Sequence, residues 1–263
     1  MKHTFAICAY KESPYLESCV SSLINQSEPS DIIICTSTPN ELIDSISRKY
    51  GLDVYIRNGE SSLKDDWNFA VDTAVYARKA ELVTVAHQDD VYRRDYVREL
   101  MRAEEKYPDM ILFTSGSCTI DKDGRKVSWL SERIKRVLRL LLRLKGLADR
   151  RFIKRSALMF GNAICCPSCT YNIRLTGLPL FKDDADFVID WLTLLRLSSL
   201  PGRFICIEKE LMCYRVHPAS ATEKNIKNNN RTKEEYAVFS GIWPKPFAAL
   251  IMKLYGLSSK VYG

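Results

Sequence analysis

The strongest constraint on the fold is a regular alternation of strand and helix patterns over the first hundred residues. Continuous apolar runs, typical of strands buried on both faces, lie at residues 5–9, 31–35, 54–56 and 82–86. Helically spaced apolar residues lie between them at residues 13–24, 41–50 and 63–80. This order predicts an α/β fold with a mostly parallel, Rossmann-like central sheet and helices on both of its faces. Ser13, followed by Pro14, is expected to cap the first helix.

The second half of the chain has a less regular pattern. Strands are predicted at residues 110–114, 204–207 and 211–214, and helices at 133–145 and within 181–200. A polar, Asn-rich loop is expected at residues 225–231, and the last thirty residues end in an apolar, helix-like stretch.

Polar clusters follow two of the predicted parallel strands. One is Thr36-Ser37-Thr38 and the other is His87-Gln88-Asp89-Asp90. In sheets of this kind ligands bind at the carboxyl ends of the strands. The sequence has no glycine-rich fingerprint after the first strand and no P-loop motif, so it supports neither a dinucleotide-binding domain nor a P-loop enzyme.

Four titratable side chains are candidates for chemistry. Asp89 and Asp90 would repel each other unless a divalent cation or ribose hydroxyls took up their charge; a solvated turn is the alternative. Asp190 lies in the apolar stretch 187–197, where burial would raise its pKa toward that of a general base. The alternative is an exposed or capping residue. His217 follows a predicted strand and has the chemistry of a metal ligand, although a lone His is more often packed or at the surface.

Positive charge is concentrated in residues 133–155, which carry ten Lys/Arg and one acid, whereas the whole chain of 263 residues has a net charge of +7. The other residues are therefore slightly acidic together, which argues against a nucleic-acid-binding protein. The predicted helix over 133–145 places its cations on one side and leucines around most of the rest. This favours an anionic membrane as partner, with a solvated core helix or a subunit contact as alternatives. The membrane-facing cations would be Lys135, Arg136, Arg139 and Arg143.

Cysteine usage and hydropathy bear on the compartment. Nine scattered cysteines suit a reducing environment, and Cys166 and Cys169, without a second such pair, are interpreted as buried small apolar residues. Charge interrupts every apolar stretch before ~18 residues, and the N-terminus lacks a signal-peptide pattern. We therefore expect a cytoplasmic protein, peripheral on the inner face of the cell membrane.

Together these motifs resemble those of family 2 glycosyltransferases of the GT-A fold. The resemblance runs from about residue 3 to 222 and keeps the order of the family's motifs. The matching segments are residues 8–16 after the first strand, 66–70 in the helix behind the metal site, 87–90 for the D-x-D-type motif, 160–168 for the acceptor-side loop, 189–191 for the Glu/x-Asp motif and 215–220 for the R-x-H-x-x-S segment.

The resemblance implies an inverting, nucleotide-sugar-dependent transferase. The donor would be a UDP-hexose or UDP-N-acetylhexosamine, and the acceptor a lipid-linked saccharide in bacterial-type surface polysaccharide assembly. The implied roles are catalytic base for Asp190, Mn²⁺ or Mg²⁺ binding for Asp90 and His217, donor binding for Tyr10, Thr36, Lys64 and Asp89, and acceptor binding for Asn162, Ser168 and Trp191. For Lys64 a solvated lysine, and for Trp191 a core position, are the alternatives.

The implied organisation is a GT-A domain over residues 1–222, followed by a tail over 223–263. The nucleotide-sugar half would be residues 1–100, and the acceptor half, with the basic helix, residues 101–222. One departure concerns the nucleobase: where the family commonly has an Asp after the second strand, this chain has Thr36, which carries no charge. A sugar nucleotidyltransferase and a catalytically silent, membrane-associated GT-A scaffold are the competing interpretations.

Overall fold

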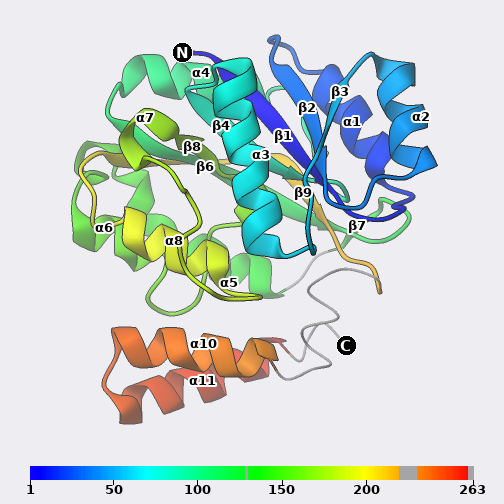
Figure 1. Ribbon diagram of the computed structural model, residues 1–263. Coiled ribbons are helices and arrows are strands. Elements are labelled where there is room, and N and C mark those ends of the chain that lie inside the picture. The colour runs from blue at the N-terminus through cyan, green and yellow to red at the C-terminus, as the bar shows by residue number, and fades with distance from the viewer. Residues whose placement is uncertain (128–129, 219–229, 260–263) are drawn as a thin grey trace.

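A nine-stranded sheet with helices on both faces forms the centre of the molecule (Figure 1), as predicted. The computed structural model describes residues 1–127, 130–218 and 230–259. Strands follow the order β3-β2-β1-β4-β8-β6-β9-β5, and β7 pairs with β6. Their bounds are β1 His3–Ala9, β2 Asp31–Thr36, β3 Asp53–Ile56, β4 Leu82–His87, β5 Val91–Tyr92, β6 Met110–Ile120, β7 Lys126–Val127, β8 Thr170–Asn172 and β9 Arg203–Arg215.

The first four strands form the parallel unit that the sequence predicts. Cys8 of β1 pairs with Cys35 of β2 on one side and with His87 of β4 on the other. The helices between them are α1 (Leu16–Ile24), α2 (Glu41–Tyr50) and α3 (Leu63–Arg78). Helix α3 packs on one face of the sheet, whereas α1, α2 and α4 (Tyr96–Lys106) pack on the other. The polar ends of β1, β2 and β4 therefore meet at one edge.

Strand β9 replaces two strands that the sequence predicts separately. It pairs in parallel with β6 along most of its length, and the register shifts where Gly116 lies opposite residues 207–210. A Cβ atom on Gly116 would lie 2.6 Å from the carbonyl oxygen of Glu208, so only glycine allows this close approach. A bulge, and not a chain break, separates the two apolar runs. The short strands β5, β7 and β8 are antiparallel to their neighbours.

The predicted basic helix over 133–145 is wrong in its extent. Helix α5 spans Leu130–Leu138 and is followed by two short 3-10 helices, Leu140–Arg143 and Lys145–Leu147, before α6 at Arg151–Ser156. Arg139 turns inward just after the helix: it is 3% exposed and its guanidinium donates a hydrogen bond to Ala163 O at 2.7 Å. Arg139 is therefore not membrane-facing, whereas Arg136 and Arg143 remain exposed.

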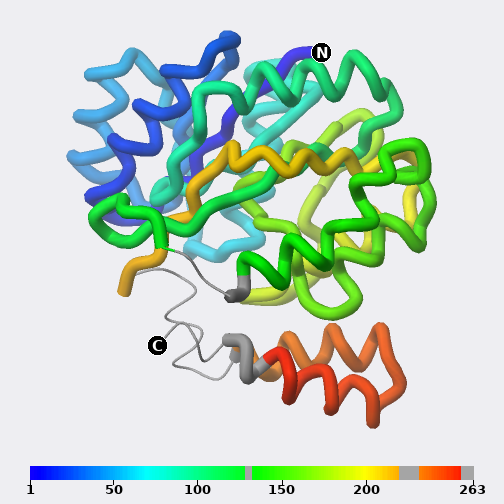
Figure 2. The backbone as a smooth tube through the Cα atoms, turned by 180° about the vertical axis from the view of Figure 1, so that it is seen from behind, coloured from blue at the N-terminus to red at the C-terminus, as the bar shows by residue number. Residues whose placement is uncertain are grey.

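The chain ends in a helical hairpin of α10 (Asn230–Ile242) and α11 (Lys245–Ser259), which lies on the side of the body away from the N-terminus (Figure 2). Phe239 and Ala248 of the hairpin are buried in the main core. Of the Asn-rich loop expected at 225–231, residues 225–229 lie outside the described residues, and the rest begins α10. The domain division at residue 222 also lies outside the described residues and stays a prediction. Within the described residues, no helix has both the length and the apolar character needed to span a bilayer.

Candidate active site

The side-chain amide of Gln88 joins the carboxyl ends of β1 and β4. It accepts a hydrogen bond from the N–H of Tyr10 and donates one to the carbonyl oxygen of Tyr10, both at 3.0 Å. The next residue, Lys11, has a left-handed φ of 54°, and its N–H donates to Oγ1 of Thr38 at 2.6 Å. The loop after β1 is thus tied to the loops after both neighbouring strands. The ring of Tyr10 remains 39% exposed beside the clustered strand ends.

Asp89 connects three segments of the chain. Its Oδ1 accepts a hydrogen bond from Oγ of Ser13 at 2.8 Å, and its Oδ2 lies 3.2 Å from Nε2 of His217. The prediction that Ser13 is the N-cap of the first helix is wrong: α1 begins at Leu16 with Tyr15 at the N-cap position. The hydroxyl of Ser13 accepts the N–H of Tyr15 at 3.3 Å and donates to the carboxylate of Asp89. Asp89 and His217, which lie 128 residues apart in sequence, are brought into direct contact.

The neighbouring carboxylate, Asp90, is almost completely buried, at 1% exposed. Its Oδ1 accepts the backbone N–H of Arg215 at 2.9 Å, whereas its Oδ2 has no hydrogen-bond partner among the described residues. Burial raises the pKa of Asp90 well above its usual value, and the N–H of Arg215 offsets part of this effect. A buried carboxylate oxygen without a partner is costly, so its environment favours a compensating cation.

His87 closes the site on the side of α3. Its ring stacks on Trp67 with a centroid separation of 5.2 Å, and its Nδ1 lies 3.8 Å from Oδ2 of Asp90. Burial lowers the pKa of His87 to about 4, so its imidazole is neutral at pH 7. The helix that carries Trp67 therefore does pack behind Asp90, as the resemblance implied.

Asp90 and His217 fit a divalent cation such as Mn²⁺ or Mg²⁺. Nε2 of His217, like Oδ2 of Asp90, has no hydrogen-bond partner among the described residues, although the carboxylate of Asp89 is close. Among the residues that the structure describes, no three His, Cys, Asp or Glu side chains are grouped closely enough to hold an ion by themselves. Cations of this type often complete their coordination with substrate phosphates and water. The donor set therefore fits a cation that binds together with a diphosphate.

Arg215, to which the sequence assigned no role of its own, organises this site. Its Nε donates to Asp89 O at 2.8 Å and its Nη1 to Asp121 O at 3.0 Å, and the guanidinium lies 4.5 Å from the ring centroid of Tyr15. It is 6% exposed. The Arg of the R-x-H-x-x-S pattern pointed to this residue. The sequence does not distinguish an exposed arginine from a buried one that holds the backbone of the site.

Asp66, at the start of α3, holds the loops that follow β2 and β3. It accepts hydrogen bonds from Arg57 at 2.8 Å, Ser37 at 3.0 Å and Ser61 at 2.5 Å. Sequence reasoning placed residues 66–70 behind the metal site but did not find this role. The partners of Asp66 are not adjacent in sequence, so no local sequence pattern reveals these hydrogen bonds.

Thr36 and Lys64, both predicted to bind the donor, are poorly placed for direct contact with it. Thr36 is only 3% exposed, and its hydroxyl accepts the N–H of Thr38 at 3.0 Å, so it supports the loop. Lys64, in the first turn of α3, lies 3.5 Å from the exposed carboxylate of Asp184. These positions agree better with supporting roles than with direct contact to the nucleobase or diphosphate.

Asp190 lies in the first turn of α8 (Ile189–Leu197), and its Oδ2 accepts a hydrogen bond from Nδ2 of Asn162 at 2.8 Å. Burial raises the pKa of Asp190 to about 6, although the backbone N–H groups of the helix terminus, Lys135 and Asn162 act to lower it. The carboxylate thus titrates within the range of a general base.

Asp90 and Asp190 each interact electrostatically with one of two adjacent thiols, Cys165 and Cys166. Burial is the main cause of the raised pKa of each thiol, and a nearby carboxylate adds to it: Asp90 for Cys165, and Asp190 for Cys166. Cys166 and Cys169 are both free, and Sγ of Cys169 points to the carbonyl oxygen of Cys165. The loop expected on the acceptor side is therefore close to both carboxylates.

Helix α10 caps the segment that leads into α8. The carboxylate of Glu234 accepts hydrogen bonds from the N–H groups of Asp186 at 3.0 Å, Phe187 at 2.8 Å and Val188 at 3.1 Å. An acidic side chain is well suited to a helix N-terminus, where N–H groups lack partners within the helix. The C-terminal hairpin thus fixes the position of Asp190.

Two predicted acceptor residues are corrected. Trp191 is 2% exposed, its indole N–H donates to Leu158 O at 3.0 Å, and its ring packs against Phe239, so it belongs to the core and cannot stack on a sugar. Ser168 is completely buried, and its hydroxyl is hydrogen-bonded to Thr114 and to the carbonyl oxygen of Cys165. Trp191 is thus part of the apolar core, and Ser168 is hydrogen-bonded to strand β6.

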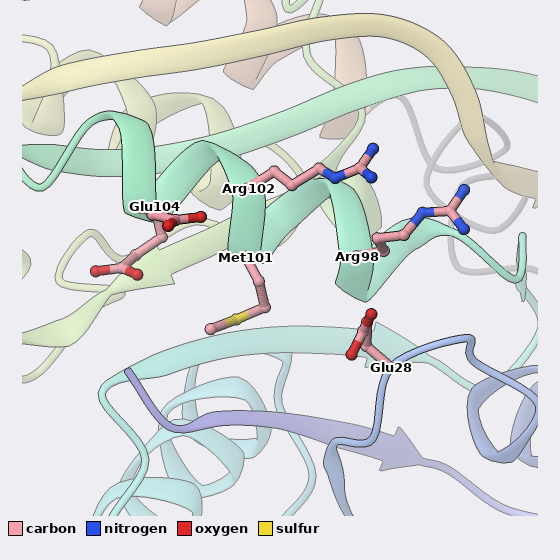
Figure 3. A pocket seen from close by; sticks show the side chains of 6 residues that line it. Glu28, Arg98, Met101, Arg102 and Glu104 are labelled. Atoms are coloured by element: carbon pink, nitrogen blue, oxygen red, sulfur yellow. The ribbon is translucent and has the colours of Figure 1, made fainter.

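A shallow depression of about 420 Å³ lies over α4, away from these residues (Figure 3). Its lining consists of Glu28, Arg98, Met101, Arg102, Glu104 and Glu105. Because Glu104 lies 3.9 Å from the N-terminal amine of Met1, it belongs to the end of β1 opposite the strand ends that carry Tyr10. The carboxyl edge of the sheet is the better candidate for the active site.

The fold is that of nucleotide-sugar-dependent transferases of the GT-A type. Residues 4–174 match the model of glycosyl transferase family 2, and the chain belongs to that family. A comparison with curated proteins finds no match.

Similar solved structures agree on the fold. TarS 1–349 of S. aureus in complex with UDP-GlcNAc has a TM-score of 0.63 and 13% identity, over 96% of this chain and 70% of that one. The mannosyltransferase PcManGT from Pyrobaculum calidifontis, with GDP-Man and Mn²⁺, has a TM-score of 0.60 and 16% identity, over 97% and 69%. Glucosyl-3-phosphoglycerate synthase from Mycobacterium tuberculosis, with Mn²⁺ and UDP-Glc, has a TM-score of 0.57 and 13% identity, over 89% and 77%.

Proposed function

We propose that this family 2 glycosyltransferase moves a sugar, with inversion, from a nucleoside-diphosphate sugar to a hydroxyl of a saccharide acceptor. The observation that carries the proposal is that the fold contains two buried carboxylates in unlike environments, Asp90 and Asp190. Asp90, with His217, has unsatisfied donor atoms suited to a cation. Asp190, with a pKa of about 6, is suited to accept a proton.

The donor would bind at the carboxyl ends of β1 and β4. Tyr10 offers a partly exposed ring for the nucleobase, and Asp89 a carboxylate for the ribose hydroxyls. A divalent cation bound by Asp90 and His217, as Mn²⁺ or Mg²⁺, would stabilise the negative charge that develops on the leaving diphosphate. Arg215 would act through Asp89 and Asp90, since it holds the backbone of one and a carboxylate oxygen of the other.

Asp190 would remove the proton from the acceptor hydroxyl as that hydroxyl attacks the anomeric carbon. Asn162 would orient the carboxylate, because its amide donates a hydrogen bond to Oδ2. The bond to the acceptor oxygen forms as the bond to the diphosphate breaks, and inversion follows from attack opposite the leaving group.

A UDP-hexose or a UDP-N-acetylhexosamine is the donor that we propose. The similar structures include complexes with UDP-GlcNAc, GDP-Man and UDP-Glc, so the fold accepts more than one base. Because the buried, uncharged Thr36 replaces a carboxylate, base selection would depend on Tyr10 and on backbone groups of the loop after β2.

We further propose that the acceptor is lipid-linked and is met at the inner face of an anionic membrane, as in surface polysaccharide assembly. Support comes from apolar side chains that are exposed on α5 and the 3-10 segments after it: Ile134, Val137, Leu140, Leu141, Leu144 and Leu147. Of the cations expected there, Arg136 and Arg143 approach Glu208, and Arg139 is buried. Apolar contact would therefore contribute more than charge to membrane binding.

The proposal is tested by measuring release of the nucleoside diphosphate from a panel of nucleotide sugars, with Mn²⁺, Mg²⁺ or EDTA. Slow hydrolysis of one UDP-sugar that requires a cation supports the transferase. Release of pyrophosphate from a nucleoside triphosphate and a sugar phosphate would instead indicate a nucleotidyltransferase. Binding without turnover, with every acceptor offered, would favour the silent scaffold.

A further inference from the structure

Two cysteines lie side by side on adjacent strands, one of them on the strand that carries Arg215. Cys118 of β6 and Cys213 of β9 are register partners in the sheet, and their Sγ atoms lie 2.8 Å apart. Both thiols are free, and they are 2% and 3% exposed. Adjacent strands are about 4.8 Å apart, which is within the Cα–Cα range that a disulfide spans. Little backbone movement would be needed to join the two sulfurs.

The pair belongs to a small apolar cluster that is separate from the two main cores. Its other members are Ile120 and, partly buried, Val91. Arg93 lies close by: its backbone N–H donates to Leu211 O at 2.8 Å, and its guanidinium interacts with the thiol of Cys118. The contact with Cys213 and the charge of Arg93 lower the pKa of Cys118 to about 7, although burial opposes this. The pair thus lies in a small apolar cluster beside the exposed Arg93.

A second cysteine pair in the same sheet provides an internal comparison. Cys8 and Cys35 are also register partners on adjacent parallel strands. Their thiols face other groups, the carbonyl oxygen of Asp66 for Cys8 and Thr73 for Cys35, and burial raises the pKa of both. Among the described contacts, only the Cys118–Cys213 pair has its two sulfurs in direct contact with each other.

We propose that Cys118 and Cys213 form a reversible disulfide that fastens β9 to β6. The oxidant is a low-molecular-weight disulfide such as oxidised glutathione. The thiolate of Cys118 attacks it and releases one thiol; the thiolate of Cys213 then attacks the mixed disulfide and releases the second. One protein S–S bond forms, and the two electrons and two protons end on the two released thiols.

The position of Cys118 and Cys213 indicates which part of the fold a disulfide would restrain. Cys213 pairs with Val91, the residue after Asp90, and lies two residues before Arg215, whose N–H holds Asp90. The disulfide would restrain β9 at the point where it supports the metal-binding carboxylate. It would also close a loop of 95 residues, which restricts the unfolded chain. The inference does not depend on the reaction that the enzyme catalyses.

The test treats the folded, full-length chain with oxidised glutathione and then measures intact mass, peptide linkage and Tm. We expect a mass lower by about 2 Da, a peptide that links residues 118 and 213, and a Tm higher by roughly 5–10 °C, all reversed by dithiothreitol. Cys206→Ser, in a buried cysteine on the same strand, should leave these changes intact, whereas Cys118→Ser should abolish them.

The linkage is measured on the unsubstituted chain, so the test does not depend on whether a variant folds. A stable glutathione adduct on Cys118, with no disulfide between Cys118 and Cys213, would overturn the proposal. A bond mapped to Cys8 and Cys35, or no reaction before the protein unfolds, would do so as well.

Discussion

Nδ2 of Asn162 lies 2.8 Å from Oδ2 of Asp190, and this hydrogen bond joins the loop before Cys165 to the first turn of α8. The same amide group folds its own loop, since Oδ1 of Asn162 accepts the N–H of Ile164 at 3.1 Å. One side chain thus fixes both the loop and the carboxylate. The proposed base is therefore oriented before any acceptor arrives, which lowers the cost of reaching a reactive geometry.

Replacing the proposed base should separate activity from folding. In Asp190→Asn, turnover should fall by ~10²–10⁴-fold because no carboxylate can take the acceptor proton, while donor affinity stays near that of the wild type. The free energy of unfolding should not fall, and could rise by up to about 3 kcal/mol, because a buried charge is removed. Kinetics, donor titration and thermal unfolding measure the three quantities. Unchanged turnover would remove Asp190 from the mechanism.

The pH dependence should report the same carboxylate. Because only the ionised form accepts a proton, kcat/KM should increase as the pH rises through about 6 and level off above 7. Stability should change in the opposite direction: the folded pKa lies above that of the unfolded chain, so ionisation costs folding free energy between about pH 4 and 6. The rate profile of Asp190→Glu, which keeps an acid at this position, should retain an inflection. A flat profile in the wild type from pH 5 to 8 would contradict this assignment.

Removing a metal ligand should affect donor binding and not only turnover. Asp90→Ala and His217→Ala should lose the Mn²⁺-dependent part of nucleotide-sugar affinity, measured by calorimetry with and without EDTA. Asp44→Asn, in an exposed position on α2, provides the matched control and should bind as the wild type does. Equal affinity of Asp90→Ala in Mn²⁺ and in EDTA, at the wild-type level, would show that the cation is not held there.

The contact between α10 and the start of α8 should affect both the stability of the fold and the pH profile of the reaction. Glu234→Ala removes an acceptor shared by three backbone N–H groups, so the free energy of unfolding should fall by about 1–2 kcal/mol. The inflection near pH 6 should also shift, since the start of α8 would no longer be fixed. The exposed neighbour Lys233→Ala should change neither quantity. A loss of stability with an unaltered pH profile would mean that Glu234 is only structural.

Membrane binding should depend on apolar residues more than on cations. Val137→Asp, at a side chain that is 62% exposed, should reduce pelleting with anionic vesicles several-fold, whereas Arg136→Gln should reduce it by less. Tyr76→Ser, a comparably exposed aromatic on α3, serves as the control for a general loss of hydrophobicity. If wild-type protein pellets equally little with anionic and neutral vesicles, this surface has another partner.

The part of the fold that follows local periodicity could be predicted from sequence. Helix α2 is an example: Asn40 accepts the N–H of Ile43 at its start, and Gly51 adopts a left-handed conformation at its end, so local signals define both limits. Arg139 shows the opposite case, because a partner 24 residues away removes it from the helical surface that its spacing predicts. Tertiary contacts decide such positions.

The same distinction applies to the site. Asp89, Asp90 and Asp190 could be found because acids are unusual after a buried strand or within an apolar helix. Glu234 and Arg215 could not, since each acts through backbone groups of segments 46 to 126 residues away, and backbone groups leave no mark in the sequence. Trp191 was misassigned because an aromatic residue beside a catalytic acid suits a sugar platform and a core equally well.

The Gln88 amide has a consequence for how this edge of the sheet can move. By pairing with both backbone polar groups of Tyr10, it acts as one more rung of the β1–β4 ladder beyond the last strand residues. The backbone of Tyr10 is therefore tied to the segment that carries Asp89 and Asp90. In the proposed binding mode, base and diphosphate would contact one connected unit of the fold and not two independent loops.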